Sequence, residues 1–323
     1  MNTKPLAILI SDIHYSLPTL DLADKSLRMA IAIAHNKQIP LIVAGDLHDS
    51  KANLRAECVK AIIETFKTAK VPCYVIVGNH DKVNEKSQDH ALEFLREIVT
   101  LVDKPTIFSN CLLLPYYSDI DALRQFLKSL PQGRQVIMHQ GLQGSNLGDY
   151  IQDKTTLNTN DVAHIKVVSG HYHCRQTTDN WSYIGNPYTL TFGEANDPEK
   201  GFQILRSDFS LEFVPTGLRK HIIYDIHVND VIIPKHSMGD LIWVKMRGPK
   251  SELVQISRRR LESVLGTKSF KLDFYPDDTN TISVVETSKT LIFDSIIENS
   301  TVPTVQKDRL KILWRELDET AKR

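Results

Sequence analysis

The sequence predicts an α/β fold, in which a layered core of strands and helices is followed by a smaller α+β unit. Three observations lead to this prediction. Short aliphatic runs end abruptly in clusters of Asp, His, Asn and Gly, amphipathic helical patterns separate the early runs, and the pattern changes near residue 216. Alternating strands and helices are typical of a layered α/β core, and the change of pattern indicates a second unit.

Five aliphatic runs are predicted to be strands. They show no polar alternation, which is the pattern of strands that are covered on both faces. A polar cluster follows each run directly, and ligands of open α/β sheets gather at the carboxyl ends of strands. We therefore expect the five clusters to share one site. The five runs are 6–10, 40–44, 73–77, 135–138 and 165–169.

Helices and a second unit complete the predicted organisation. Apolar residues recur at helical spacing in 20–35, 53–68 and 90–102. Beyond residue 216, a strand, a helix and a strand are predicted in 241–246, 251–265 and 269–275. We predict a first domain at 1–215, a β-α-β domain at 216–288 and a tail at 289–323, in which 307–320 forms an amphipathic helix.

Composition and charge narrow the possible classes of protein. The 323 residues carry 39 Lys and Arg and 39 Asp and Glu, so the formal net charge is zero. This excludes binding of nucleic acid by bulk charge, and any such binding must use a local patch or a metal site. We expect no membrane span, because no window of ~18 consecutive apolar residues occurs. The first apolar run is too short for a signal peptide. Four widely spaced cysteines without a CxxC pair indicate reduced thiols in a cytoplasmic protein.

The polar clusters contain ligands suited to metal ions. Residues two apart at a strand end point the same way, so Asp12 with His14, and His171 with His173, can each reach one ion. Seven mixed N and O donors are too many for one tetrahedral zinc and suit two ions that share a carboxylate. Without thiolate, manganese, iron or zinc is expected. The candidate ligands are Asp12, His14, Asp46, Asn79, His139, His171 and His173.

The charge of such a site indicates an anionic substrate. Two divalent ions and two carboxylates leave a net charge of about +2, which attracts phosphate esters. Each cluster has a plainer explanation when it is taken alone, as a turn or as a hydrogen-bonded core histidine. Five clusters in order, each behind a buried strand, are difficult to explain in that way.

The order Asp-x-His, Gly-Asp-x-x-Asp, Gly-Asn-His-Asp, His and Gly-His-x-His resembles the calcineurin-like metallophosphoesterase superfamily. The resemblance implies two mixed β-sheets sandwiched by helices. It implies that Asp46 bridges the two ions, that His80 stabilises the transition state or protonates the leaving oxygen, and that Asp81 orients His80. The implied ligands of the first ion are Asp12, His14, Asp46 and His173, and those of the second are Asp46, Asn79, His139 and His171.

Two further features narrow the resemblance. Gly78-Asn79-His80-Asp81, and the lack of Arg soon after the second motif, depart from the pattern of Ser/Thr protein phosphatases. The stretch 183–194 and Lys200-Gly201-Phe202 are similar to SbcD-type recombination-repair nucleases, and the unit after 216 is similar to their DNA-capping domain. This resemblance implies a Mn²⁺-dependent 3′–5′ exonuclease and endonuclease that acts on DNA ends in a bacterial or phage-infected cell.

The same resemblance implies partners. An SMC-like ATPase of the SbcC type is expected, and so is a homodimer formed through 53–68 and 90–102, whose apolar faces could equally be core. Supporting roles near the site are assigned to His48 and Asp49. Segment 307–320 would dock on the ATPase or on its own domain. Residues expected to contact DNA phosphates, unless they form an ordinary solvated face, are Lys245, Arg247, Lys250, Arg258, Arg259 and Arg260.

Two other functions remain open from the sequence. A small-molecule or cyclic-nucleotide phosphodiesterase could use the same core, but it would not need the capping unit or its basic residues. A non-catalytic scaffold that tethers DNA or an ATPase is a third hypothesis. Scaffolds derived from this superfamily tend to lose ligands, and all seven are present here.

Overall fold

The computed structural model describes most of the chain. The described residues are 3–50, 54–84, 87, 89–146, 156–178, 180–197, 199–229, 236–237 and 239–277. The predicted tail 289–323, with its helix at 307–320, lies outside them.

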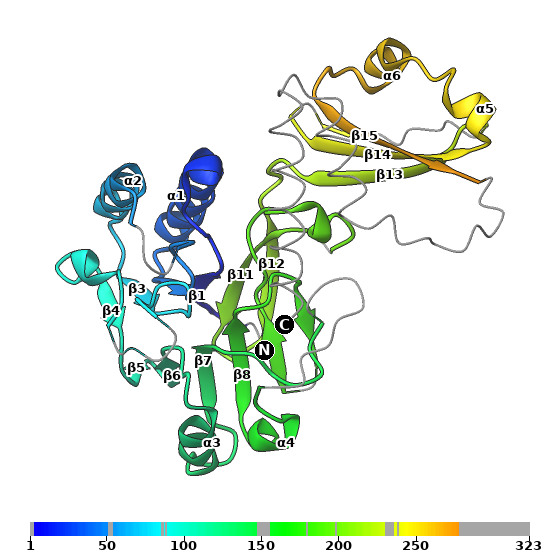
Figure 1. Ribbon diagram of the computed structural model, residues 1–323. Coiled ribbons are helices and arrows are strands. Elements are labelled where there is room, and N and C mark those ends of the chain that lie inside the picture. The colour runs from blue at the N-terminus through cyan, green and yellow to red at the C-terminus, as the bar shows by residue number, and fades with distance from the viewer. Residues whose placement is uncertain are drawn as a thin grey trace, which may run out of the picture.

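Two six-stranded mixed sheets form the core of the chain (Figure 1). Strands β1, β2, β3 and β4 run parallel in the first sheet, and β6, β7, β8 and β10 run parallel in the second. The first sheet has the order β12 (Leu211–Pro215), β11 (Gly201–Arg206), β1 (Pro5–Ile10), β2 (Leu41–Ala44), β3 (Cys73–Ile76) and β4 (Thr100–Val102). The second has the order β5 (Thr106–Phe108), β6 (Cys111–Leu114), β7 (Gln135–His139), β8 (Lys166–Gly170), β10 (Trp181–Tyr183) and β9 (Gln176–Thr177).

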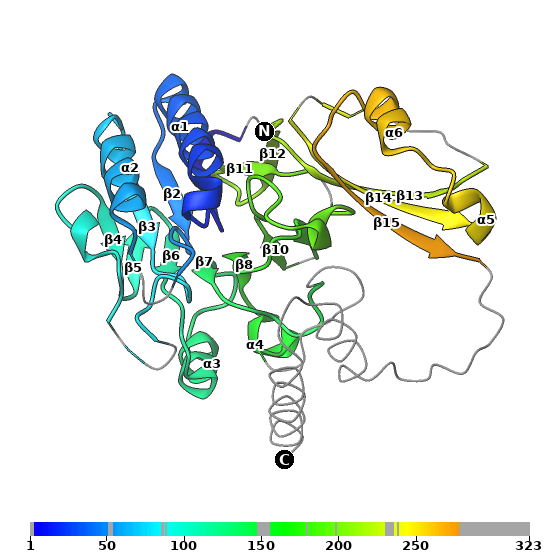
Figure 2. The same cartoon turned by 45° about the horizontal axis from the view of Figure 1, so that its top comes forward.

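The two sheets pack against each other, and helices cover their outer faces (Figure 2). Strand β1 shows the layering, because Ala7 and Leu9 join the cluster between the sheets while Ile8 and Ile10 pack in the cluster that contains residues of α1. The sandwich fold and the strands buried on both faces are therefore confirmed. The helices are α1 (Leu20–Lys37) and α2 (Ala56–Lys67) on the first sheet, and α3 (Ile120–Lys128) and α4 (Thr159–Val162) on the second.

The structure confirms two of the three helices predicted in the core and corrects the third. Helices α1 and α2 lie where apolar spacing placed them. Segment 90–102 is not a helix: it contains one 3-10 turn, η2 (Glu93–Leu95), and the strand β4. Ile98 and Val99 lead into β4, and β-branched residues favour strands. The pairing of Thr100 with Tyr74 on β3 extends the first sheet and stabilises this alternative.

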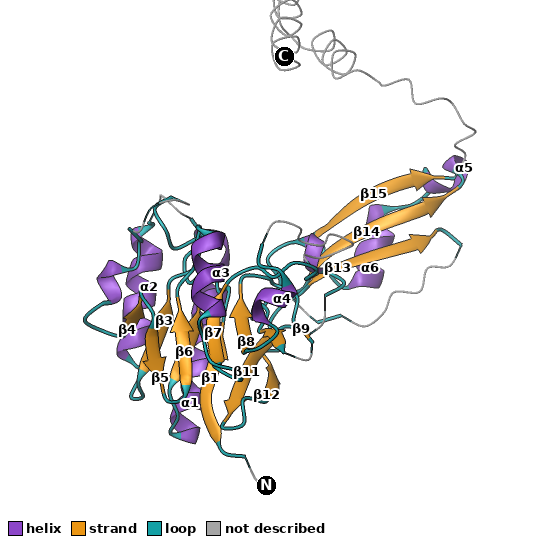
Figure 3. Ribbon diagram, turned by 90° about the horizontal axis from the view of Figure 1, so that it is seen from below, coloured by secondary structure: helices purple, strands orange, loops and turns teal. Residues whose placement is uncertain are grey.

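A three-stranded parallel sheet follows the core. It consists of β13 (His221–His227), β14 (Leu241–Gly248) and β15 (Phe270–Pro276), which lie to one side of the two larger sheets in Figure 3. Strand β13 was not predicted. The single helix predicted at 251–265 is two helices, α5 (Lys250–Leu253) and α6 (Arg258–Leu265), because Ser257 is extended and starts a new helix. The division into domains stays a prediction.

The three-stranded sheet with α5 and α6, residues 221–276, is called the capping unit below, and it contacts a short segment of the core. This segment contains the 3-10 turn η3 (Phe192–Glu194). The Phe192 ring meets His221 and Trp243 edge-on, with centroids 4.8 and 5.5 Å apart. Thr189 Oγ1 also accepts a hydrogen bond from the backbone N–H of His221 at 2.8 Å. These aromatic and polar contacts hold β13 and β14 against the core.

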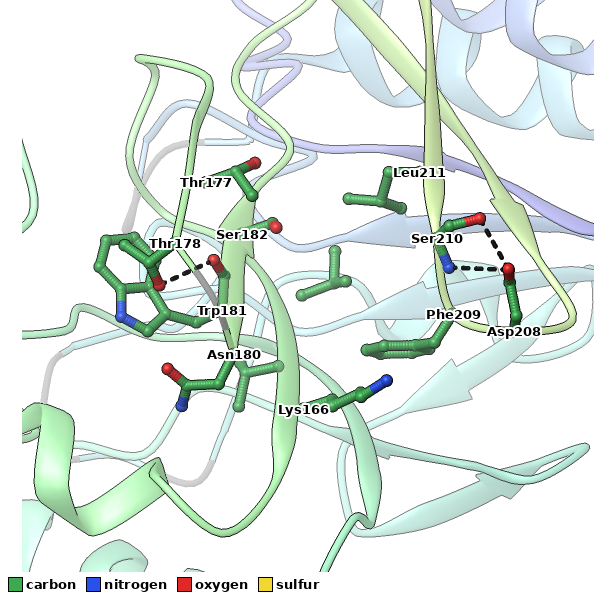
Figure 4. Close-up of a pocket in the computed structure, with 12 residues that line it drawn as sticks. Lys166, Thr177, Thr178, Asn180, Trp181, Ser182, Asp208, Phe209, Ser210 and Leu211 are labelled. Atoms are coloured by element: carbon green, nitrogen blue, oxygen red, sulfur yellow. Dashed lines mark hydrogen bonds between the residues drawn. The ribbon is translucent and has the colours of Figure 1, made fainter.

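A pocket of about 310 Å³ opens between β8, β10 and the turn that joins β11 to β12 (Figure 4). Lys166, Trp181 and Phe209 line it, and Asp208 accepts hydrogen bonds from Ser210 beside it. Lys166 is at the amino end of β8, whereas the polar cluster follows its carboxyl end. The pocket is therefore at the opposite end of that strand from the predicted site. In the described part of the chain, no helix is both long and apolar enough to cross a bilayer.

Candidate metal centre

The structure brings all seven predicted ligands to one edge of the two sheets. They follow or end five parallel strands, so the carboxyl ends of these strands define the site. Backbone hydrogen bonds from Asp12 N to Gly45 O and from His14 N to Asp46 O, both 3.1 Å, hold the first two loops together. The ligands come from β1 (Asp12, His14), β2 (Asp46), β3 (Asn79), β7 (His139) and β8 (His171, His173).

The ring nitrogens of His14 and His173 provide the sharpest sign of a cation site. His14 Nδ1 donates to Asp49 Oδ1 at 3.0 Å, and His173 Nδ1 donates to Glu194 Oε1 at 2.8 Å. In neutral rings with Nδ1 protonated, each Nε2 carries a lone pair, and the two Nε2 atoms face each other at 3.2 Å. Two lone pairs at this distance repel each other unless a proton or a metal ion lies between them, and carboxylates are the usual orienting groups of metal-binding histidines.

Asp46 joins this half of the site to the other half. Its Oδ2 lies 3.2 Å from His139 Nε2 and 3.8 Å from His14 Nε2, while its Oδ1 accepts the backbone N–H of His80 at 2.9 Å. Asn79 Oδ1 faces the second half, 3.0 Å from His139 Nε2 and 2.9 Å from His171 Nδ1. One oxygen of Asp46 therefore lies between two groups of donors. Close sets of ligand atoms are formed by Asp12, His14 and His173, by Asp46, His139 and His171, and by His14, Asp49 and His80.

Backbone strain is concentrated at these ligands. The described non-glycine residues with positive φ include Asp12 and His14, both at 52°, Asp46 at 48° and His171 at 92°. Such conformations cost of order 1–3 kcal/mol each and persist where surrounding structure enforces them. The strain turns side chains that leave a strand toward a common centre.

Two glycines explain why the loops approach so closely. A Cβ on Gly78 would lie 2.2 Å from Asp46 Oδ1, and a Cβ on Gly170 would lie 1.9 Å from Ser11 Oγ. Each glycine comes immediately before a predicted ligand, Asn79 or His171. The absence of a side chain at these two positions lets the strand ends converge.

Burial and charge act together in the centre. Burial alone would raise the pKa of Asp46, but His139 and His14 lower it well below its usual range. Burial would lower the pKa of His139, yet Asp46 and Asp12 raise it to about 9. Burial, followed by the charge of His139, lowers the pKa of His171 to about 4. The centre thus gathers carboxylates and imidazoles that can exchange protons for a cation.

The donor set fits divalent ions. Asp12 and His139 have no exposed surface and Asp46 is 2% exposed, so these buried donors need a charged partner. Carboxylate, amide oxygen and imidazole without thiolate suit manganese, iron or zinc. Asp46 is suited to bridge, with Asp12, His14 and His173 on one side and Asn79, His139 and His171 on the other.

His80 lies at the rim of the centre, and the expected role of Asp81 is corrected. His80 Nδ1 donates to the carbonyl of Asp49 at 2.7 Å, and its ring meets His14 edge-on at 4.9 Å. Asp81 accepts the backbone N–H groups of His48 and Gly78 at 2.9 and 2.8 Å, so its carboxylate orients loops and not the His80 ring. Burial, with the charge of Asp46, raises the pKa of Asp81 to about 6.

Two supporting carboxylates stand out in the structure. Asp49, assigned a supporting role, contacts His14. Glu194 was not predicted as a site residue, although its stretch was recognised as similar to the nucleases. Its Oε2 accepts Asn186 Nδ2 and Leu190 N, both at 3.0 Å, which locks its Oε1 toward His173. The sequence pattern gives no signal for this contact with His173, because the contact depends on how residues 186–194 fold. His48 is buried, with Nδ1 near Ser50.

The six basic residues predicted to contact DNA do not form one patch. Ile242, Val244 and Met246 pack in the cluster that contains Leu261 of α6, so Lys245 and Arg247 point to the other, open face of the sheet. Arg247 is also paired with Asp225 at 2.6 Å. Lys250 belongs to α5, and Arg258, Arg259 and Arg260 to α6, on the helix side.

Comparison with known proteins defines the class to which this fold and site belong. Residues 7–175, which include all five strand-end clusters, match the calcineurin-like phosphoesterase family. The chain belongs to this family. Its members are metal-dependent phosphoesterases, in agreement with the donor set described above.

A particular relative is more informative. The chain is 29% identical over 201 residues to Exonuclease subunit 1 of Enterobacteria phage T4. The match covers 55% of this chain and 56% of that protein, so the chain spans little more than half of the relative's length.

Proposed function

We propose that this protein is a metal-dependent DNA nuclease that hydrolyses phosphodiester bonds at DNA ends, both as a 3′–5′ exonuclease and as an endonuclease, in recombination and repair. The observation that carries the proposal is the convergence of seven N and O ligands, with Asp46 between the other six and His80 at the rim. Likeness to a phage exonuclease subunit favours DNA over other phosphodiesters. Mn²⁺ is the proposed cofactor, because the site combines oxygen with imidazole donors.

The side chains around the centre have distinct roles in this proposal. Divalent ions, when bound, would act as Lewis acids and supply an activated water. Asp49 and Glu194 fix the rings of His14 and His173 so that each Nε2 faces the centre. His80 donates Nδ1–H to the carbonyl of Asp49, which leaves its Nε2 free to face the substrate. In the imidazolium form, Nε2–H would give its proton to the leaving oxygen and the ring would become a neutral imidazole that keeps Nδ1–H.

We further propose an SMC-like ATPase partner and a homodimer in the cytoplasm. The relative's name, which describes a subunit, supports a partner. Of the two segments proposed for the dimer surface, only α2 is a helix, so a dimer would rely on α2. The four cysteines are free and buried, which suits a reducing compartment.

An assay on end-labelled duplex and single-stranded DNA tests the proposal. We expect cleavage with Mn²⁺, none with chelator, and a loss of at least about 100-fold in His80→Ala at unchanged metal stoichiometry. The matched control is His164→Ala, because His164 bonds Leu127 O on the helical side of the second sheet, away from the centre. Cleavage of bis(p-nitrophenyl) phosphate without cleavage of DNA would support the phosphodiesterase hypothesis instead, and absence of bound metal would support the scaffold.

A further inference from the structure

A second pocket, of about 260 Å³, lies beside the candidate metal centre. We name it the Lys82 pocket, after its most deeply buried charged residue. It sits at the carboxyl ends of β3, β4 and β6, the same edge at which the metal ligands gather. The residues that matter for its chemistry are Val77, Lys82, Asp103, Lys104, Tyr116 and Tyr117.

The pocket shares a wall with the centre. Tyr116 lines the pocket, and the centroid of its ring lies 6.0 Å from that of His171 and 6.4 Å from that of His139. Val77, also in the lining, precedes the ligand Asn79 by two residues and accepts the backbone N–H of Tyr116 at 2.8 Å. The Lys82 pocket and the candidate metal centre therefore adjoin at Tyr116.

Lys82 is an unusual lysine. It is 4% exposed, and none of the carboxylates in the described part of the chain lies within ion-pair distance of its Nζ. Its Nζ lies 5.6 Å from the centroid of the Tyr116 ring, a cation–π distance. Burial lowers the pKa of Lys82, because low-dielectric surroundings disfavour the charged ammonium group. A buried cation of this kind needs an anion.

The lining carries two acids and two lysines, and the acids have partners of their own. Asp103 is held by Arg96 at 2.6 Å, and Asp119 accepts the backbone N–H of Ala122 at 2.9 Å, so both acids in the lining are engaged. Lys104 adds a second cation, exposed at the mouth and without an ion pair among the described residues. The tyrosines 116 and 117 supply flat surfaces for a sugar or a base.

We propose that the Lys82 pocket binds a nucleotide unit of the substrate next to the scissile bond, with Lys82 holding its phosphate and Tyr116 and Tyr117 contacting its sugar or base. The volume is slightly below the ~300 Å³ at which pockets for drug-sized ligands begin, which suits one nucleotide and not a longer stretch. The proposal rests on the proposed function, and it names the part of the substrate that this pocket recognises.

Binding to metal-free protein tests the pocket without interference from the centre. The probes are dAMP, deoxyadenosine and inorganic phosphate, measured by calorimetry in chelator. We expect dAMP to bind more tightly than either fragment, and Lys82→Met to weaken dAMP binding at least about tenfold. Lys82→Arg should restore most of it. The matched control is Lys25→Met, which replaces an exposed lysine of α1 and should bind as the parent does. Equal binding of dAMP by Lys82→Met and parent, or equal binding of dAMP and inorganic phosphate by the parent, would overturn the proposal.

Kinetics with Mn²⁺ separate this inference from the proposed function. In Lys82→Met we expect the KM for DNA to rise about tenfold, while hydrolysis of bis(p-nitrophenyl) phosphate stays close to that of the parent. A parallel loss on both substrates would show damage to the centre and would contradict a nucleotide pocket. If the parent cleaves no DNA, the proposed nuclease fails, and the comparison of dAMP binding still decides whether the pocket exists.

Discussion

Glu194 accepts a hydrogen bond from His173 Nδ1 at 2.8 Å and thereby fixes which ring nitrogen of His173 faces the candidate metal centre. Asn186 and Leu190 hold the other carboxylate oxygen, so Glu194 itself has little freedom. Phe192, two residues earlier, packs against the capping unit. The support of one ligand and the seat of the cap therefore belong to the same short segment.

Replacing Glu194 should weaken metal binding. In Glu194→Gln the amide can no longer provide a charged acceptor for His173, and loss of such an orienting group typically costs 10–100-fold in metal affinity. Titration with Mn²⁺, followed by calorimetry or by electron paramagnetic resonance, measures the change. Glu199→Gln, at an exposed position of the same region, is the matched control and should bind metal normally. Normal affinity in Glu194→Gln would show that His173 is held by other contacts.

Gly78→Ala should disrupt the centre through sterics alone. The new Cβ would lie 2.2 Å from Asp46 Oδ1 and 2.3 Å from its backbone N, so the loops after β2 and β3 must separate. We expect a loss of about 1–3 kcal/mol in the free energy of unfolding, as for other overpacked sites, together with weaker metal binding. Urea unfolding and metal titration give the two quantities.

Gly133→Ala provides the contrast for that experiment. Gly133 has φ +74°, but a Cβ there would have no neighbour within 4 Å. It should cost about 1–2 kcal/mol of stability from backbone strain and leave metal affinity unchanged. If both variants lose metal equally, the close approach at Gly78 is not the cause.

Adding metal should raise thermal stability. The buried donors and the strained ligand backbones become favourable only when a cation compensates them. At a Mn²⁺ concentration of 100 times its Kd, the gain is about 2.7 kcal/mol. Scanning calorimetry with Mn²⁺ and with chelator measures it, and Asp12→Asn should show a much smaller shift. An identical Tm with and without metal would argue against the centre.

Asp161 should stabilise the fold in a pH-dependent way. Burial would raise its pKa, but Arg124, the backbone N–H of Asn158 and Lys128 lower it below the ordinary value of 3.8. Its stabilisation is therefore complete above that value and disappears as the pH falls through the lowered pKa of the folded state. Asp161→Asn should cost about 1 kcal/mol at pH 7, typical of a lost capping bond, and the difference should shrink in acid. Asp121→Asn, which removes the exposed partner of Arg124, should have little effect at either pH.

The two faces of the capping unit should contribute differently to DNA binding. Trp243 packs against Phe192 of the core, so the open face of the sheet, with Lys245 and Lys271 beside Trp243, is nearer to the core than α6. The pair Lys245→Ala and Lys271→Ala should weaken the salt dependence of DNA binding. The slope of log K against log salt concentration should fall in magnitude by about one for each lost phosphate contact. Arg259→Ala with Arg260→Ala is the matched pair on the helix side. An effect confined to that second pair would reverse the assignment.

The strand-end clusters were predictable because both the strands and the chemistry are local in sequence. The unbroken apolar pattern of a run such as 6–10 indicates a buried strand. Asp12 and His14 follow this run two residues apart, which is the spacing at which side chains of a strand point the same way. The convergence of all seven ligands followed from the rule that parallel strands share a carboxyl edge.

What could not be predicted depends on contacts between distant segments. Segment 90–102 has helical spacing, yet its pairing with β3 makes its end a strand, because tertiary contacts override a short pattern. Glu194 gave no signal as a support of His173, since only the folded segment 186–194 aims it. The role of Asp81 was misassigned for the same reason: its carboxylate faces backbone N–H groups that come from two separate loops.

The centre draws its ligands from both sheets, beginning at Asp12 and ending at His173. A growing or half-folded chain can hold at most part of this set, since the first sheet provides Asp12 and Asp46 while the second provides His139 and His171. The complete set of donors therefore requires both sheets to be folded and packed together, so a fragment that contains only one of them cannot form the centre.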